Sequence, residues 1–325
     1  MPIGNKVYLN NSYDILLALL EKGEFVTYRR KKQGIGLHIS SFGKNEESKK
    51  IIPGSRKIFH EREEEFLFKK YLIPLKTNKR NSKYYSITPV GIAYLFSHLE
   101  TIDKHQVKSA FRFFEFFYDS GLEKYSVFES YQKWFGSDIV PLDKIFSSLD
   151  SKWISDIVKI AANSIKIEQS GEKLTILLSH SINDFNLVYL KRFEIFNDEI
   201  IMRYMDDSLI SYLKEEKVVE SYFFRVISEH FTNIFYFTLL EYCFNERERR
   251  RSISCSNIPV SQNTIEKIEQ VEKLFSPESL KRSLMFKHML SRSLYVQQNR
   301  LDDFEKSIGH KLKSRGIPNL PIDWN

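Results

Sequence analysis

The sequence predicts a mainly α-helical protein with two domains. An N-terminal domain over residues 1–103 combines helices with a β-hairpin (α+β), and a larger, mostly helical domain covers residues 104–325. Three observations lead to this prediction. A length of 325 residues with 42% hydrophobic side chains suits about two globular domains. Apolar residues recur at helical spacing along most of the chain, and the excess positive charge is confined to the first third.

The charge distribution says more than the net charge of +7. Residues 1–103 contain 18 basic and 11 acidic side chains, whereas residues 104–325 contain 31 of each. Nine basic residues fall between Arg29 and Lys57, and four more between Lys76 and Lys83. One such run is equally typical of a solvated loop. Two runs in one small domain favour binding to a polyanion, because lysine and arginine neutralise phosphates and release counterions.

The chain opens with an amphipathic helix, expected over residues 12–22. Ser12 can cap it, its leucines and isoleucines share one face, and Gly23 stands where it would stop. Residues 25–28 are β-prone. The stretch 29–54 contains four glycines, so we expect loops with at most short elements there.

Residues 55–99, the rest of the first domain, are expected to form a helix, a β-hairpin and another helix. A second helix is expected over residues 55–71, followed by strands over 72–76 and 83–88 that a polar turn joins. Pro74 cannot donate a ladder hydrogen bond, so this hairpin should lie at a sheet edge. Thr88 and Pro89 then cap and open a third helix over residues 90–99.

One segment of this domain resembles a known family. The string YSITPVGIAYL, from Tyr85 to Leu95, resembles the exit from the wing of winged helix-turn-helix DNA-binding regulators, especially archaeal and MarR- or PadR-like ones. Residues 69–73 resemble that family's passage from recognition helix to wing. The similarity covers residues 12–100. It implies that a helix enters the major groove and that the basic tip of the wing lies on the DNA backbone or in the minor groove.

The chain departs from the family pattern in two places. A basic segment of about thirty residues stands where the family has its second helix, and the presumed recognition helix carries four glutamates, at positions 61 and 63–65, which phosphates repel. We therefore expect a mixture of contacts from the wing, the inserted segment and the basic start of the second helix, since helix N-termini favour phosphate. The predicted nucleic-acid-binding residues are Arg29, Arg30, Lys31, Lys32, Lys49, Lys50, Arg56, Lys57, Arg62, Lys79, Arg80 and Lys83.

The remaining two thirds of the chain are rich in aromatic residues. Residues 173–178 and 185–196 fit either strands or a further helix. The C-terminal pair of helices could form the seam of a homodimer or close the core of its own domain, because its pattern lasts fewer heptads than a coiled coil would show. Helices are expected over residues 105–118, 142–167, 222–244, 264–275 and from 276 to 294.

No catalytic or metal-binding motif is visible. His60 and Glu61 begin like a zinc-protease helix, but residue 64 is glutamate where the second histidine would stand. We expect Cys243 to be a core residue and Cys255 a loop thiol, with a redox pair as the alternative. The N-terminus does not resemble a signal peptide and no apolar stretch reaches the length of a membrane span. We expect a cytoplasmic protein without cofactor, metal or membrane contact.

These observations predict a DNA-binding protein that regulates transcription and is not an enzyme. Its expected partners are double-stranded DNA and a second copy of itself, and the sequence does not identify an effector. Two alternatives stay open. The N-terminal domain could contact protein without binding DNA, or the C-terminal domain could process nucleic acid, although no carboxylate cluster supports such an enzyme.

Overall fold

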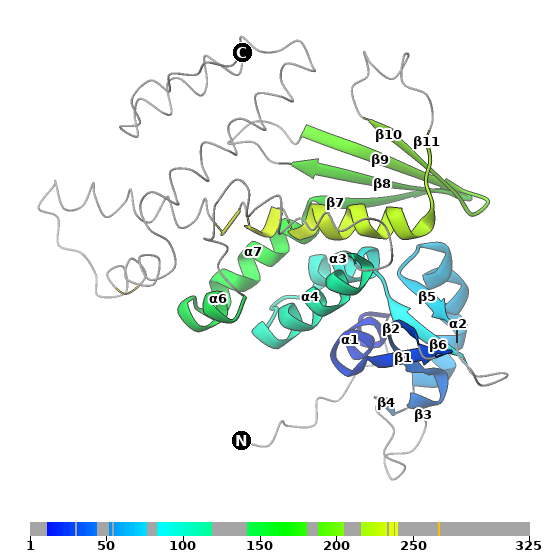
Figure 1. Ribbon diagram of the computed structural model, residues 1–325, viewed down its shortest axis with the longest axis horizontal. Coiled ribbons are helices and arrows are strands. Elements are labelled where there is room, and N and C mark those ends of the chain that lie inside the picture. The colour runs from blue at the N-terminus through cyan, green and yellow to red at the C-terminus, as the bar shows by residue number, and fades with distance from the viewer. Residues whose placement is uncertain are drawn as a thin grey trace, which may run out of the picture.

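Two antiparallel sheets with a layer of helices between them make up the described part of the computed structural model (Figure 1). This part consists of residues 12–29, 31–43, 52–53, 55–76, 83–118, 142–180, 188–204, 216–232, 234–236, 238–239 and 266. The C-terminal helices expected over 264–294, the dimer seam and both cysteines lie outside the described residues, apart from residue 266.

The N-terminal elements alternate helices with hairpins. They follow one another as α1 (Ser12–Lys22), β1 (Glu24–Tyr28), β2 (Lys31–His38), the 3-10 turn η1 (Ile39–Ser41), β3 (Phe42–Gly43), β4 (Ile52–Pro53), α2 (Ser55–Phe68), β5 (Leu72–Leu75), β6 (Tyr84–Ile87) and α3 (Pro89–His98). Strands β1, β2, β6 and β5 form an antiparallel sheet in that order, and β3 pairs with β4 in parallel. The predicted hairpin is confirmed, and Pro74 lies in β5 at the sheet edge as expected.

Strand β2 corrects the expectation of loops over residues 29–54. Gly34 and Gly36 lie inside this eight-residue strand. A Cβ at Gly36 would overlap the carbonyl oxygen of Tyr85, and a Cβ at Gly34 would lie 2.9 Å from Leu75. The glycines therefore mark a close approach of the neighbouring hairpin and not a loop.

The junction between hairpin and α3 explains the Thr-Pro-Val-Gly motif. Thr88 has the extended backbone of a helix N-cap, and its side chain accepts a hydrogen bond from the Gly91 N–H at 3.1 Å. The Thr88 hydroxyl also donates to the carbonyl of Lys70, and the Thr88 N–H donates to that of Tyr71. A side chain at Gly91 would overlap the Tyr71 carbonyl. The motif thus fixes the end of α2 against the start of α3.

The C-terminal part is not mostly helical, so the predicted mainly α fold is wrong. After α4 (Lys104–Tyr118), α6 (Leu142–Ser148) and α7 (Ser151–Asn163), five antiparallel strands form a sheet in the order β11-β10-β9-β8-β7. A helix over residues 220–232 follows them. The five strands are β7 (Ile165–Ser170), β8 (Lys173–His180), β9 (Val188–Phe196), β10 (Glu199–Tyr204) and β11 (Glu216–Lys217).

Two tight turns generate this sheet. Gly171, at a φ of 59°, begins the two-residue turn between β7 and β8. Asn197 and Asp198, with φ of 49° and 61°, form the turn between β9 and β10. Positive φ matches the twist of a two-residue hairpin, and glycine and asparagine tolerate it. Within residues 173–178 and 185–196, for which the sequence fits either strands or a helix, the described residues therefore form strands that these tight turns join.

The helix over residues 220–232 packs between both parts of the molecule. Phe223 contacts Phe193 on the inner face of the sheet, with ring centroids 5.0 Å apart. Phe231 contacts Phe96 of α3 at 6.3 Å and Phe114 of α4 at 4.9 Å. The buried hydrophobic residues on the two sides of residue 103 form one continuous cluster. The domain boundary at 103 stays a prediction, but the described core does not divide there.

Among the described helices, none has the length and hydropathy needed to cross a bilayer.

Candidate functional site

A cleft of about 730 Å³ opens where the N-terminal part meets the five-stranded sheet. One wall comes from the end of α2 and from α3, and the other comes from the end of α7 and the hairpin β7–β8. The lining residues are Lys69, Tyr71, Tyr94, Ser97 and His98 on the first wall and Asn163, Ile165, Lys166, Ile167, Glu168, Gln169 and Leu174 on the second. Ligand pockets typically have volumes of about 300–1,000 Å³ and often lie between structural units.

Stacked aromatic rings form the N-terminal wall. The Tyr94 ring lies 4.3 Å from that of Tyr71 and 5.7 Å from that of Tyr13, with interplanar angles of 18° and 24°. His98 lies 4.4 Å from Tyr94, and the Lys69 ammonium lies 6.0 Å from the centre of the Tyr71 ring. Burial, together with a hydrogen bond to Tyr13, raises the pKa of the Tyr94 phenol. The stack therefore gives the cleft a wall of aromatic rings.

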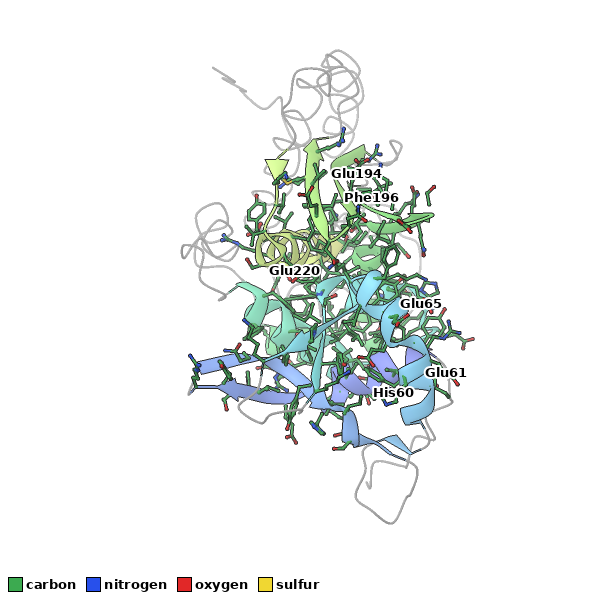
Figure 2. The ribbon with its side chains drawn as sticks, turned by 90° about the vertical axis from the view of Figure 1, so that its right-hand side faces the viewer. His60, Glu61, Glu65, Glu194, Phe196 and Glu220 are labelled. Carbon is green, nitrogen blue, oxygen red and sulfur yellow. The ribbon has the colours of Figure 1, made fainter. Side chains whose placement is uncertain are left out.

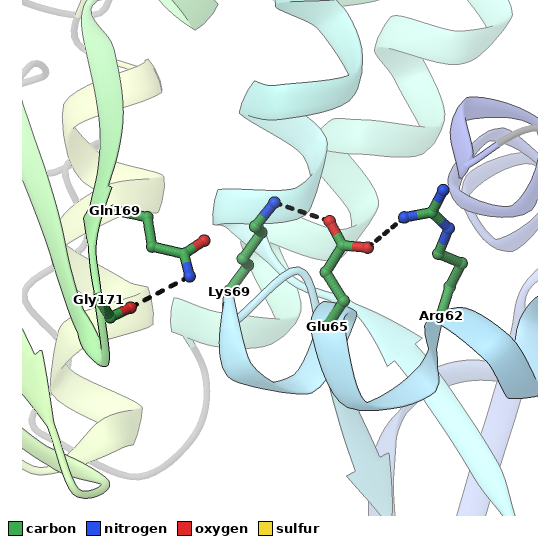
Figure 3. A network of polar contacts seen from close by, with 5 residues as sticks. All are labelled: Arg62, Glu65, Lys69, Gln169 and Gly171. Atoms are coloured by element: carbon green, nitrogen blue, oxygen red, sulfur yellow. Dashed lines mark hydrogen bonds and ion pairs between the residues drawn. The ribbon is translucent and has the colours of Figure 1, made fainter.

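A chain of charges extends from this wall along α2 (Figure 3). Glu65 binds Lys69 at 2.7 Å and Arg62 at 2.6 Å. The hydrogen bond from Lys69, supported by Arg62, holds the pKa of the Glu65 carboxyl below its ordinary value despite partial burial. Across the cleft, the Gln169 side chain donates to the carbonyl of Gly171 at 3.2 Å. The walls thus offer rings, cations and amides to a ligand.

The described residues hold no group of three or more histidine, cysteine, aspartate or glutamate side chains that could bind a metal ion. The cleft presents binding groups drawn from both parts of the molecule.

The predicted nucleic-acid contacts fall in several places, and many lie outside the description. Residues 30, 49, 50, 79 and 80 are not described, and for Lys31, Lys32, Arg56 and Lys57 only the backbone is described. Arg29 occupies the turn between β1 and β2 at a φ of 48° and is exposed, with its guanidinium 5.1 Å from the centre of the Tyr28 ring. Lys83, exposed at the start of β6, lies 3.5 Å from Glu63. Arg62 lies near the cleft.

Basic residues lie at opposite ends of one sheet. Tyr28 pairs with Lys31, so Arg29 and Lys31 lie at the turn at one end of β2. At the other end of β2, His38 pairs with Tyr84, the neighbour of Lys83. Seven residue steps at about 3.3 Å separate Lys31 from His38, so the two ends lie about 23 Å apart.

The outward side of α2 is largely acidic. Figure 2 shows Glu61 and Glu65 along this helix, with His60 beside them. Glu63 accepts a hydrogen bond from the Tyr85 hydroxyl and faces Lys83. Although burial opposes the effect, these two groups hold the pKa of the Glu63 carboxyl below its ordinary value. The negative charges of Glu63 and Glu65 are therefore balanced by cations of the protein, while the side chains of Glu61 and Glu64 are exposed on the surface.

Two features that could contribute to binding are not visible in the sequence. Arg112 of α4 lies over the exposed Phe25 ring of β1 at 5.7 Å, which adds a cation and an aromatic surface near the β1–β2 hairpin. Only the fold brings residues 25 and 112 together. The cleft was missed for the same reason, because its walls are about seventy to one hundred residues apart in the chain.

Comparisons with protein-family models, with curated proteins and with solved structures find no match for this chain.

Proposed function

We propose that the protein binds double-stranded DNA through its N-terminal part and acts in transcription regulation. The observation that carries this proposal is the four-stranded sheet with basic residues at both ends. Arg29 is exposed in the turn of one hairpin, and Lys76 and Lys83 are exposed at the ends of β5 and β6. A separation of about 23 Å between the two ends fits within one DNA turn, which is about 34 Å long.

The resemblance to winged helix-turn-helix regulators supports the same proposal. Strand β2 pairs with β6, β6 pairs with β5, and α2 leads directly into the β5–β6 hairpin. This hairpin therefore follows α2 as the wing follows a recognition helix. The acidic side of α2 limits base readout by that helix, so the proposal assigns most of the affinity to phosphate contacts from the two hairpins.

Gel shifts across a salt gradient test the proposal. One variant replaces Lys79, Arg80 and Lys83 with alanine, and another replaces Arg29, Arg30, Lys31 and Lys32. Each should weaken binding on every DNA sequence and flatten the salt dependence by up to about 0.9 per lost phosphate contact. A matched control replaces three exposed lysines of the C-terminal part, Lys144, Lys152 and Lys217, and should bind like the unmodified protein.

Parallel shifts with single-stranded DNA and RNA establish which polyanion is preferred. Duplex DNA should bind most tightly, and equal loss in the control variant would contradict the assignment to the hairpins.

A protein-binding role for the N-terminal part is the second candidate. The exposed Glu61 and Glu64 on α2, with Phe68 37% exposed at its end, favour it. Absence of any salt-dependent DNA binding by the unmodified protein would favour this candidate over the first.

A further inference from the structure

Strand β7 has an edge that no other described strand covers. It is the last strand of the five-stranded sheet and pairs with β8 on one side only. An edge strand presents a row of backbone N–H and C=O groups that can pair with another extended chain.

The register of the β7–β8 hairpin identifies the peptide groups that point outward. Ser170 and Lys173 flank the two-residue turn, so they form a hydrogen-bonded pair. Along an antiparallel ladder, hydrogen-bonded pairs alternate with pairs that are not hydrogen-bonded. The same alternation makes Ser164 and Ser179 a hydrogen-bonded pair, and the Ser179 N–H does donate to the Ser164 carbonyl at 2.8 Å. The peptide groups of Ile165, Ile167 and Gln169 therefore point away from β8.

These groups face the cleft described above. Five consecutive residues of β7, Ile165 to Gln169, line it, together with Asn163 and Leu174. Because successive side chains of a strand point to opposite faces of the sheet, five consecutive residues can line one cleft only where it runs along the strand edge. The opposite wall includes Tyr71, Tyr94 and His98, which give the cleft an aromatic boundary facing β7.

We propose that this cleft binds an extended peptide of a partner protein, which adds to β7 as a further strand. Neighbouring strands lie about 4.8 Å apart, main-chain hydrogen bonds to an edge supply affinity, and alternate side chains supply specificity. The charged lining residues are Lys69, Lys166 and Glu168, with His98 beside them. Lys69 shares the carboxylate of Glu65 with Arg62, so three cations stand against two carboxylates around the cleft. This excess of positive charge favours a peptide that carries acidic side chains. This inference does not depend on DNA binding.

Selection of a peptide and substitution at Gln169 test the proposal. A phage library of linear ten-residue peptides is panned against the full chain, and the strongest binder is synthesised and titrated. The selected sequences should be enriched in aspartate and glutamate. Gln169→Pro removes an N–H that points into the cleft and leaves the ladder to β8 intact, so it should weaken binding at least tenfold. The matched variant Gln169→Ala loses the same side-chain amide but keeps this N–H, so it should bind at least fivefold more tightly than Gln169→Pro.

Hydrogen exchange gives an independent readout on the unmodified chain. Peptide binding should slow exchange of the Ile167 and Gln169 amides, and circular dichroism should show that the proline variant is folded. If the proline variant is not folded, the exchange measurement alone decides. The proposal is overturned if the library yields no binder, if Gln169→Ala weakens binding as much as Gln169→Pro, or if the bound peptide leaves both amides unprotected.

Discussion

Gly91 is a residue at which backbone packing leaves no room for a side chain. A Cβ there would overlap the Tyr71 carbonyl and lie 3.0 Å from Ile87. We expect Gly91→Ala to lower the free energy of unfolding by about 2–3 kcal/mol, measured by urea denaturation, because overpacking of this size displaces the backbone. Gly171→Ala is the matched control. Nothing lies within 4 Å of a Cβ at Gly171, so only its φ of 59° opposes alanine, at about 1 kcal/mol. An equal loss in both variants would contradict the crowding argument.

Lys70 is held in a backbone conformation that favours glycine. It ends α2 at a φ of 57°, with the Tyr71 N–H donating to the Phe66 carbonyl and the Lys70 N–H donating to that of Leu67. This is the hydrogen-bond pattern of a Schellman motif, in which glycine is preferred at the position of Lys70. Its ammonium reaches Asp198 at 3.4 Å and Glu220 at 3.3 Å, which links α2 to the C-terminal sheet.

Two substitutions at Lys70 separate the backbone from the ion pairs. Both Lys70→Ala and Lys70→Gly remove the ammonium, but only glycine relieves the positive φ. We expect the glycine variant to be more stable than the alanine variant by about 1 kcal/mol in urea denaturation. The loss from the ion pairs themselves should be small, about 0–1 kcal/mol, because both acidic partners are exposed. An alanine variant as stable as the glycine variant would show that the positive φ carries no cost.

At the scale of elements, the pairing of β9 with β10 depends on one buried glutamate. Arg192 and Arg203 are directly opposite each other in the register, and like charges in that position repel. Glu194 lies between them, binding Arg192, Arg203 at 3.2 Å and Lys173 at 2.8 Å. Burial alone would raise the pKa of the Glu194 carboxyl, but these three cations outweigh burial and hold the pKa below its ordinary value.

Glu194→Gln should therefore destabilise the protein in a pH-dependent manner. We expect a loss of about 2 kcal/mol at pH 7, below the range for a fully buried pair because the cations are about one third exposed. A lowered folded-state pKa contributes stability that is present above the unfolded value of 4.5 and is lost as pH falls through the folded value. The difference between variant and unmodified protein should narrow below pH 4.5 in urea titrations. A difference that stays constant down to the folded-state pKa and below it would assign the loss to packing.

Local signals explain which elements the sequence could predict. The capping of α3 by Thr88 and the edge position of Pro74 are consequences of one residue's own chemistry, and both predictions are confirmed. Strand β2 was missed because Gly34 and Gly36 indicate loops when only the local sequence is considered. In the fold, glycine is needed there because Leu75 and Tyr85 of the neighbouring hairpin come too close for a side chain. Residues 173–178 and 185–196 stayed open between strands and a helix, because the cross-strand pairing that forms β8 and β9 is not visible in the local sequence.

At the scale of the molecule, the cleft could not be read from the sequence. Its walls carry no motif, and Lys69, Tyr94 and Gln169 become neighbours only through the packing of α3 against α7 and β7. The role of Arg62 also depends on contacts that only the fold creates. Its sequence position in a basic domain favoured a phosphate contact, but in the fold it pairs with Glu65.

The continuous core predicts how fragments of the chain behave. The charge distribution predicts that the chain divides into two domains at residue 103. A fragment of residues 1–103 contains every strand of the four-stranded sheet. That fragment lacks α4, which packs on α1, and the helix over residues 220–232, whose Phe231 covers Phe96. Phe96, fully buried in the intact chain, would then lose the cover that Phe231 provides and lie next to water.

We therefore expect fragment 1–103 to unfold at a lower urea concentration than the full chain, with a broad transition and with binding of a hydrophobic dye. Exposing one buried side chain of this size costs about 1.5–3 kcal/mol, and a small domain has only about 5–15 kcal/mol of stability in total. Co-expression with residues 104–325 should restore a sharp transition if the two pieces share one core. A sharp transition for fragment 1–103 alone, at the midpoint of the full chain, would instead show that residue 103 separates two independently stable units.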